Sequence, residues 1–218
     1  MVRLCLEFIA LYVALPAALL ALRQAAGPFP VLPVLWAAAL PAGVYLVVRQ
    51  GWGRRELIGF AWPSGTGGRL LLRLALAAAL LFGGLWLLEP ALFLELPRRS
   101  PGLWALVMLL YPVLSVYPQG LLYRGLFFAR YARLFGGARA QELAAAAAFC
   151  LAHLVFANVW AVALTFVGGV LLARTYRATG SLMASNIEHA AYGQLLFTAG
   201  WGRYLYHGTL RLLERIPS

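Results

Sequence analysis

Residues 103–129 read LWALVMLLYPVLSVYPQGLLYRGLFFA, and this stretch decides the fold. It contains one charged residue, Arg124, and is longer than the roughly 20 residues that a helix needs to cross the hydrocarbon core of a bilayer. The whole chain of 218 residues has the same character, because 63% of its residues are apolar and 11% are charged. Soluble domains average about 25% charged residues, so the composition excludes a soluble globule. We predict an all-α, polytopic transmembrane helix bundle that forms a single membrane domain over residues 1–218.

Further apolar runs lie on both sides of this stretch. The candidate spans, about seven, are residues 4–22, 29–48, 70–94, 103–129, 143–159, 161–173 and 182–199. The run 161–173 is short for a complete crossing, so we expect residues 143–173 to form a tight or partly re-entrant hairpin that turns near Asn158. The alanine run 144–148 predicts the close approach of a neighbouring helix. We divide the domain into N-terminal helices, residues 1–102, and a core, residues 103–207.

The charged residues favour a membrane and argue against nucleic acid. The 18 basic residues are all arginines, the 7 acidic residues are all glutamates, and the formal net charge is +11. The arginines lie in the gaps between apolar runs, where such residues set membrane orientation and contact anionic lipid headgroups. The side of the N-terminus would carry Arg3, Arg49, Arg54, Arg55, Arg69, Arg130, Arg133, Arg139, Arg174 and Arg177, and the other side Arg23, Arg98, Arg99, Arg203, Arg211 and Arg215. This bias predicts a cytoplasmic N-terminus, with membrane lipids as partners and no nucleic acid.

Polar residues within the predicted spans indicate a site inside the membrane. An ionisable side chain in hydrocarbon is costly, so it usually faces the bundle interior and has a partner or a function. Counted from the nearest loop at about 1.5 Å per residue, Gln119 and His153 lie about 16 Å deep and His189 about 12 Å deep, from the same side. Arg124 lies close to Gln119 in the sequence. We expect three helices to bring these four residues together.

Helical geometry separates some neighbours of these residues. Gln119 and Tyr123 are four residues apart and share a helical face, whereas Arg124 lies about 100° further round. Glu188 directly precedes His189, so the two side chains diverge by about the same angle. We expect Glu188 to pair with Arg124 or with an arginine of residues 174–177.

Three short motifs resemble those of a known family. The sequence YPQGLLYRG at residues 117–125 is similar to the first motif of the CPBP family, which usually reads Glu-Glu-x-x-x-Arg or Gln-Glu-x-x-x-Arg. FCLAH at residues 149–153 resembles the family's Phe-x-x-x-His, and His189 resembles the His that opens His-x-x-x-Asn. The family comprises type II CAAX prenyl endopeptidases, bacteriocin-processing enzymes and Abi-type intramembrane proteases. The resemblance covers residues 103–207 and implies a multi-pass protein of a bacterial inner membrane.

The sequence departs from these motifs at two positions. Gly120 stands where the family has its catalytic Glu, with Gln119 before it, and Gly193 stands in place of the motif's Asn. The catalytic positions that the resemblance implies are His153, His189, Arg124, Gln119 and Gly120. The candidate substrate-binding residues near the motifs are Tyr123, Phe149, Asn158 and Gln194.

The family reaction is hydrolysis of a peptide bond near the membrane face. The resemblance implies a Glu that acts as general base on water, a first His that assists it, and a second His that stabilises the oxyanion with its Asn and Arg. Because Gly120 replaces the Glu, we expect impaired hydrolysis of a membrane-associated peptide or protein substrate. The alternative is a catalytically silent member that binds a membrane peptide or partner protein in the same cleft. A transporter is disfavoured, because the sequence shows no inverted repeat.

A metal site would need more ligands than these motifs supply. Catalytic zinc commonly takes three protein ligands and a water. Without the carboxylate, His153 and His189 remain, and Cys150 is a less favoured third ligand. We predict no tightly bound metal and no cofactor, and the sequence does not define an oligomeric state.

Overall fold

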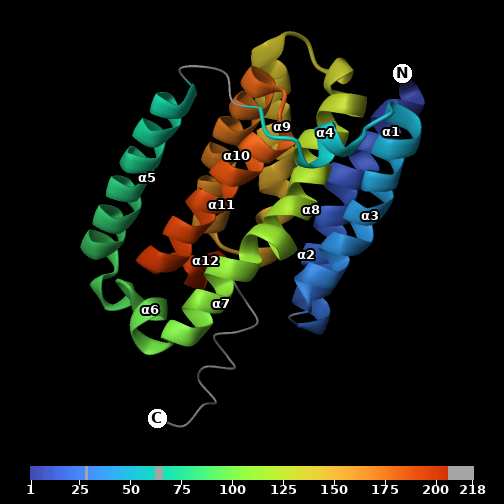
Figure 1. Cartoon of the computed structure of the whole chain (residues 1–218). Coiled ribbons are helices and arrows are strands. Elements are labelled where there is room, and N and C mark those ends of the chain that lie inside the picture. Colours follow the sequence, from blue (N-terminus) through green and yellow to red (C-terminus); the bar gives the residue numbers. More distant parts are fainter. Residues whose placement is uncertain (28, 62–65, 206–218) are drawn as a thin grey trace.

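The computed structural model describes residues 1–27, 29–61 and 66–205 and shows a bundle of helices (Figure 1). The part of the chain before the core consists of α1 (Val2–Ile9), η1 (Ala10–Ala14), α2 (Leu15–Ala26), α3 (Val31–Gln50), α4 (Arg54–Ile58), α5 (Thr66–Leu88), η2 (Pro90–Leu92) and α6 (Glu95–Arg99). The core consists of α7 (Pro101–Tyr111), η3 (Pro112–Val116), α8 (Tyr117–Gly120), η4 (Leu121–Tyr131), η5 (Ala132–Leu134), α9 (Ala138–Ala152), η6 (His153–Phe156), α10 (Val159–Thr179), α11 (Leu182–Ala199) and α12 (Gly202–Leu205). The described residues contain no strand, so the all-α prediction is confirmed.

Six helical segments of the described chain are long and apolar enough to cross a membrane. They are Val2–Ala26, Val31–Gln50, Gly67–Leu88, Pro101–Leu134, Ala138–Phe156 and Val159–Thr179. The chain is therefore an integral, multi-pass membrane protein. The seventh predicted span, residues 182–199, forms helix α11 but is not among the six, because it carries the polar residues Ser185, Asn186, Glu188 and His189.

The hairpin predicted for residues 143–173 is wrong in one respect. α10 has 21 residues, which is a full membrane crossing rather than a short or re-entrant segment. The turn lies where the sequence predicts it, because Ala157 has a φ of 53° and Asn158 caps α10. The alanine run admits α10 closely: a Cβ on Gly169 would lie 2.9 Å from the Cα of Ala146.

The elements from α7 to η5 follow one another without a loop and form one long, bent helix. Pro112 and Pro118 lie inside it and lack the backbone N–H that a regular helix requires. The turns of η3 and η4 widen to the π-helical type, in which hydrogen bonds join residues five apart. Figure 1 shows this helix changing direction between α7 and α8. The bend carries α8 and η4 into the bundle, where they contact α3, α9 and α11.

A cluster of aromatic side chains packs η4 against the N-terminal helical segment Val2–Ala26. Tyr12 is 1% exposed, and its hydroxyl donates to the Leu122 carbonyl at 2.8 Å. Its ring lies 5.6 Å from that of Tyr123 and 5.5 Å from that of Tyr131, measured between centroids. These buried contacts hold the element that carries Arg124.

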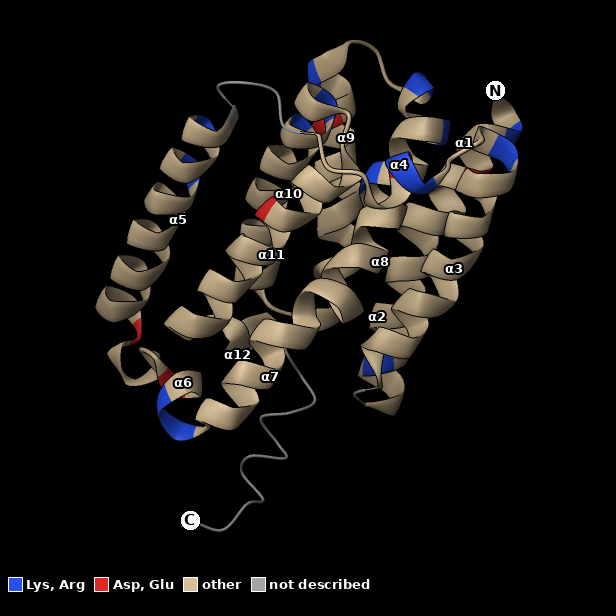
Figure 2. Ribbon diagram, in the orientation of Figure 1, with Lys and Arg blue, Asp and Glu red and all other residues tan. Residues whose placement is uncertain are grey.

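Basic residues gather at both ends of the bundle (Figure 2). One end has the N-terminus, α4 and the start of α5, and the opposite end has α6. The elements that carry Arg3, Arg54 and Arg55 therefore lie at the opposite end from α6, which carries Arg98 and Arg99. Arg211, Arg215 and residues 206–207 of the predicted core fall outside the described residues.

Candidate functional site

α11 supplies two polar side chains from one face. Asn186 and His189 are three residues apart, so they are neighbours on the helix surface, and they are 4% and 6% exposed. Ser181 caps the helix by accepting a hydrogen bond from the Ala184 amide at 3.2 Å. Ser185 donates to the Leu172 carbonyl of α10 at 3.0 Å. These two bonds fix the position of α11 and therefore of both side chains.

Arg124 joins η4 to α11. It is 2% exposed, and its Nη2 donates to Asn186 Oδ1 at 3.3 Å and to His189 Nδ1 at 3.0 Å. We call Arg124, Asn186 and His189 the polar cluster. The ion pairs among the described residues do not include Arg124, so its guanidinium is buried without a carboxylate partner.

The two ring nitrogens of His189 have different roles. A guanidinium can only donate, so His189 Nδ1 must accept from Arg124. A neutral imidazole then carries its hydrogen on Nε2, which lies 3.3 Å from the Tyr111 hydroxyl of α7. The Tyr111 oxygen therefore accepts from His189, and the hydroxyl hydrogen of Tyr111 is left for another acceptor.

His153 reaches the polar cluster through Phe149. Its Nδ1 donates to the Phe149 carbonyl at 2.7 Å, so a neutral ring has its lone pair on Nε2. The Phe149 ring lies 4.5 Å from the His153 ring and 5.3 Å from the His189 ring, measured between centroids. The Arg124 guanidinium carbon lies 5.5 Å from the same ring centre. Three helical segments therefore bring the predicted Arg124, His153 and His189 around one aromatic ring.

Four buried polar side-chain atoms of the described residues have no hydrogen-bond partner, and two of them belong to the polar cluster. Among the described residues these atoms are Gln119 Oε1, Arg124 Nε, Asn186 Nδ2 and Glu188 Oε2. Gln119 donates through Nε2 to Ser115 at 2.8 Å, which leaves its carbonyl oxygen unsatisfied. Arg124 Nε and Asn186 Nδ2 are donors within the polar cluster itself. A buried donor without an acceptor costs about 1–3 kcal/mol, so an acceptor that entered the site would be stabilised.

The two glycines that depart from the family motifs both face polar side chains. A Cβ on Gly120 would lie 2.7 Å from Asn186 Nδ2 and 2.8 Å from its Cγ. A Cβ on Gly193 would overlap the ring and hydroxyl of Tyr111. Asn186 and Tyr111 therefore occupy the space next to each glycine, and both belong to the hydrogen-bonded arrangement around His189.

Glu188 does not have the partner that the sequence suggests. It is fully buried and pairs with Arg73 of α5 at 3.4 Å, rather than with Arg124 or residues 174–177. The Tyr192 hydroxyl also donates to it at 2.8 Å. Because these partners hold its Oε1 on the α5 side of α11, Glu188 supplies no carboxylate to the polar cluster.

Three of the four predicted substrate-binding residues have structural contacts. Asn158 accepts from the Ala161 amide at 2.8 Å and donates to the Tyr204 carbonyl at 2.6 Å, so it ties α10 to α12. Gln194 donates to the Met108 carbonyl of α7 at 2.9 Å. Tyr123 packs in the aromatic cluster, 5.5 Å from the Phe149 ring. Of these four residues, Phe149 is the one that touches both histidines.

The site does not have the ligand set of a catalytic zinc. No three His, Cys, Asp or Glu side chains of the described chain come together in a way that could hold a metal ion. The Cys150 thiol donates to the Val162 carbonyl of α10 at 3.3 Å, so it does not complete a set with the histidines.

Two residues of the site, Tyr111 and Asn186, escape prediction from the sequence. Asn186 lies three residues before His189, and that helical spacing is a signal for a shared face. Tyr111 lies in the same apolar stretch as Gln119 and is one of 10 tyrosines in the chain, so nothing in the sequence distinguishes it.

The site and fold define a multi-pass membrane protein with a buried, cationic polar site between its helices. Residues 101–194 match the family model described as "Type II CAAX prenyl endopeptidase Rce1-like". A search of curated proteins and a search of solved structures found no match. The matched segment contains every member of the polar cluster, together with Tyr111 and His153. Through this segment, which is less than half of the chain, the protein is similar to the type II CAAX prenyl endopeptidase, or CPBP, family.

Proposed function

We propose that this chain is a CPBP-type peptidase relative that binds a membrane-associated peptide at the polar cluster and has lost efficient hydrolysis. The observation that carries the proposal is a buried guanidinium without a carboxylate in contact, with one unpartnered N–H donor of its own and a second on the neighbouring amide. Arg124 Nε and Asn186 Nδ2 are those donors. A peptide carbonyl oxygen is an acceptor of the matching kind.

The donors also suit the chemistry of the family. When water attacks a peptide carbon, negative charge develops on the carbonyl oxygen, and preorganised donors in a dry site stabilise it. A buried cation such as Arg124, 3.0 Å from His189, adds to this stabilisation. The site therefore retains the groups that bind a carbonyl and support an oxyanion.

The site lacks the general base that the family's hydrolysis reaction uses. The resemblance places the family's Glu at position 120, and the space beside Gly120 is taken by Asn186. A positioned general base typically contributes about 10²–10⁴-fold to the rate. Hydrolysis by this chain is accordingly expected to be slower than that of a relative with the carboxylate by about that factor.

His153 supports a second candidate, residual hydrolysis with an imidazole as base. Its Nδ1 is committed to the Phe149 carbonyl, so Nε2 of the neutral ring can accept a proton from water. Water would then add to the carbonyl carbon and the peptide nitrogen would leave with a proton. Under this candidate, His153→Ala abolishes a slow basal cleavage.

The test separates binding from hydrolysis. The purified full chain in lipid nanodiscs is mixed with a panel of fluorescent transmembrane peptides, and we measure anisotropy for binding and product masses for cleavage. We compare the unaltered chain with Gly120→Glu/Asn186→Gly, which supplies a carboxylate and clears its space. The matched control is Gly120→Gln/Asn186→Gly, which has the same size but no base.

We expect the unaltered chain to bind peptide and the Glu-containing double variant to cleave it about 100-fold faster or more. The Gln control should bind without this gain. Arg124→Met should weaken peptide binding. Equal cleavage by the unaltered chain and the double variant would contradict the loss of a base, and binding unchanged by Arg124→Met would contradict the binding site.

A further inference from the structure

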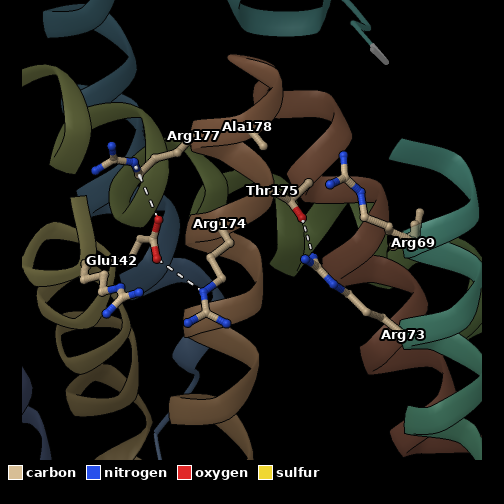
Figure 3. Close-up of a pocket in the computed structure, with 9 residues that line it drawn as sticks. Arg69, Arg73, Glu142, Arg174, Thr175, Arg177 and Ala178 are labelled. Carbon is tan, nitrogen blue, oxygen red and sulfur yellow. Dashed lines mark hydrogen bonds and ion pairs between the residues drawn. The ribbon is translucent and has the colours of Figure 1, made fainter. Parts of the chain in front are cut away.

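A polar pocket separate from the polar cluster lies at the end of the bundle that carries the N-terminus, between α5, α9 and α10 (Figure 3). Its volume is about 480 Å³. The charged residues that line it are Arg69, Arg73, Arg139, Glu142, Arg174 and Arg177. Five guanidinium groups therefore surround one carboxylate, and the family reaction uses none of them.

The single carboxylate satisfies two of these arginines. Glu142 pairs with Arg174 at 3.3 Å and with Arg177 at 3.7 Å. Arg73 donates to Thr175 at 3.2 Å and to the buried Glu188 at 3.4 Å. Figure 3 shows the Glu142 pairs and the contact between Arg73 and Thr175 on either side of the pocket.

The other two arginines have no acidic partner. No ion pair of the described residues includes Arg69 or Arg139, and both are exposed at the pocket. They come from two different elements, α5 and α9, that line the same pocket. Positively charged guanidinium groups this close together repel one another, and an anion bound between them would offset that repulsion.

We propose that this pocket binds a phosphate group. Arginine presents a planar fork of donors that matches phosphate oxygens, and a pocket of this volume exceeds what a single ion needs. The pocket is at an end of the transmembrane bundle, where lipid headgroups lie, and basic pockets between membrane helices are known to bind anionic headgroups. The phosphate can come from an anionic phospholipid or from a soluble phosphate compound.

The experiment uses the full chain and does not depend on peptidase activity. The purified protein is placed in nanodiscs of phosphatidylcholine, with or without phosphatidylglycerol, and native mass spectrometry measures the lipid that stays bound. In a separate arm, inorganic pyrophosphate is titrated into phosphatidylcholine nanodiscs and its binding is measured by calorimetry. The test variant is Arg69→Gln/Arg139→Gln, which removes the two unpartnered arginines.

The matched control is Arg54→Gln/Arg55→Gln on α4. It removes the same charge from exposed arginines at the same end of the bundle, outside the pocket. We expect the test variant to lose phosphatidylglycerol retention or pyrophosphate affinity by about 10-fold or more, and the control to change by less than about twofold. Retention of phosphatidylglycerol alone assigns the phosphate to lipid, and pyrophosphate binding alone assigns it to a soluble compound.

Two outcomes would overturn the proposal. Equal losses in the test variant and the control would mean that surface charge in general attracts the anion. Absence of binding in both arms by the unaltered, folded chain would mean that the pocket does not take phosphate. Circular dichroism of each variant establishes that the comparison is made between folded proteins.

Discussion

Two glycines of the site leave room for polar side chains from other helices. Gly120 and Gly193 each leave space that a polar side chain of another helix enters, namely Asn186 and Tyr111. The Asn186 amide of α11 thus lies beside Gly120 of α8, and the Tyr111 hydroxyl of α7 lies beside Gly193 of α11. A larger side chain at either glycine would overlap its neighbour, so a substitution there is expected to need a compensating change at Asn186 or Tyr111.

The Tyr111 hydroxyl should stabilise the protein through His189. We expect Tyr111→Phe to lower the free energy of unfolding by about 1 kcal/mol, because the buried His189 Nε2–H loses its acceptor. In a His189→Ala background the same substitution should have little effect. Denaturant unfolding in detergent measures both, and an equal cost in the two backgrounds would contradict the contact.

The sequence was sufficient to place some site residues and insufficient for others. Arg124, His153 and His189 are ionisable residues in apolar runs, and such residues usually face the interior of a helix bundle. The partner of Glu188 could not be predicted, because Arg73 lies 115 positions away and no pattern indicates that α5 packs on α11. Asn158 and Gln194 are polar residues near the motifs, but their hydrogen bonds to backbone carbonyls depend on how neighbouring helices end.

Helix α5 is attached to α11 partly through a buried ion pair. Glu188 is fully buried, whereas Arg73 is 33% exposed, so the arginine approaches from the surface and satisfies a carboxylate that is out of water. Trp201 adds a second tie by donating to the Leu81 carbonyl at 2.8 Å. These contacts connect the N-terminal helices to the core that matches the family.

Removing Arg73 should loosen this attachment. We expect Arg73→Met to lower the free energy of unfolding by about 2–3 kcal/mol, because a buried carboxylate loses its cation. The control is Arg99→Met, which removes an arginine that is 77% exposed in its pair with Glu95 and should cost about 0–1 kcal/mol. Thermal unfolding in micelles measures the difference, and equal costs would contradict a stabilising role for Arg73.

The ends of the helices show which sequence signals are reliable. Hydropathy alone locates the apolar runs, because the bilayer sets a minimum length. The predicted span 70–94 is too long, since the chain leaves the helix at Leu88 before Glu89 and Pro90. The predicted span 161–173 is too short, because Arg174 and Arg177 continue α10 while their side chains pair with Glu142.

Different elements lie at the two ends of the helix bundle. The N-terminus and α4 lie at one end and α6 at the other. The arginine pattern predicts that the end with the N-terminus is cytoplasmic. The pocket with five arginines would then face the cytoplasmic leaflet, where anionic lipids concentrate their charge.

Cysteine labelling on intact cells tests this orientation. With Cys5 and Cys150 replaced by Ala, we expect a membrane-impermeant maleimide to label Gly102→Cys and not Arg54→Cys. Both positions are exposed, and a Cβ at Gly102 would meet no other element within 4 Å. Labelling of Arg54→Cys alone would reverse the predicted orientation, and labelling after lysis is the control for reactivity.

The most direct test of the site is a double-mutant cycle between Gly120 and Asn186, followed by unfolding in detergent. Alanine stabilises a helix interior relative to glycine by about 1 kcal/mol, and Gly168→Ala, which faces open space, provides that reference. We predict that Gly120→Ala destabilises the unaltered chain by about 1–3 kcal/mol and becomes stabilising once Asn186→Ala has removed the overlapping amide. If Gly120→Ala stabilises the chain in both backgrounds, as Gly168→Ala should, Asn186 does not fill the space beside Gly120 and the account of the site is wrong.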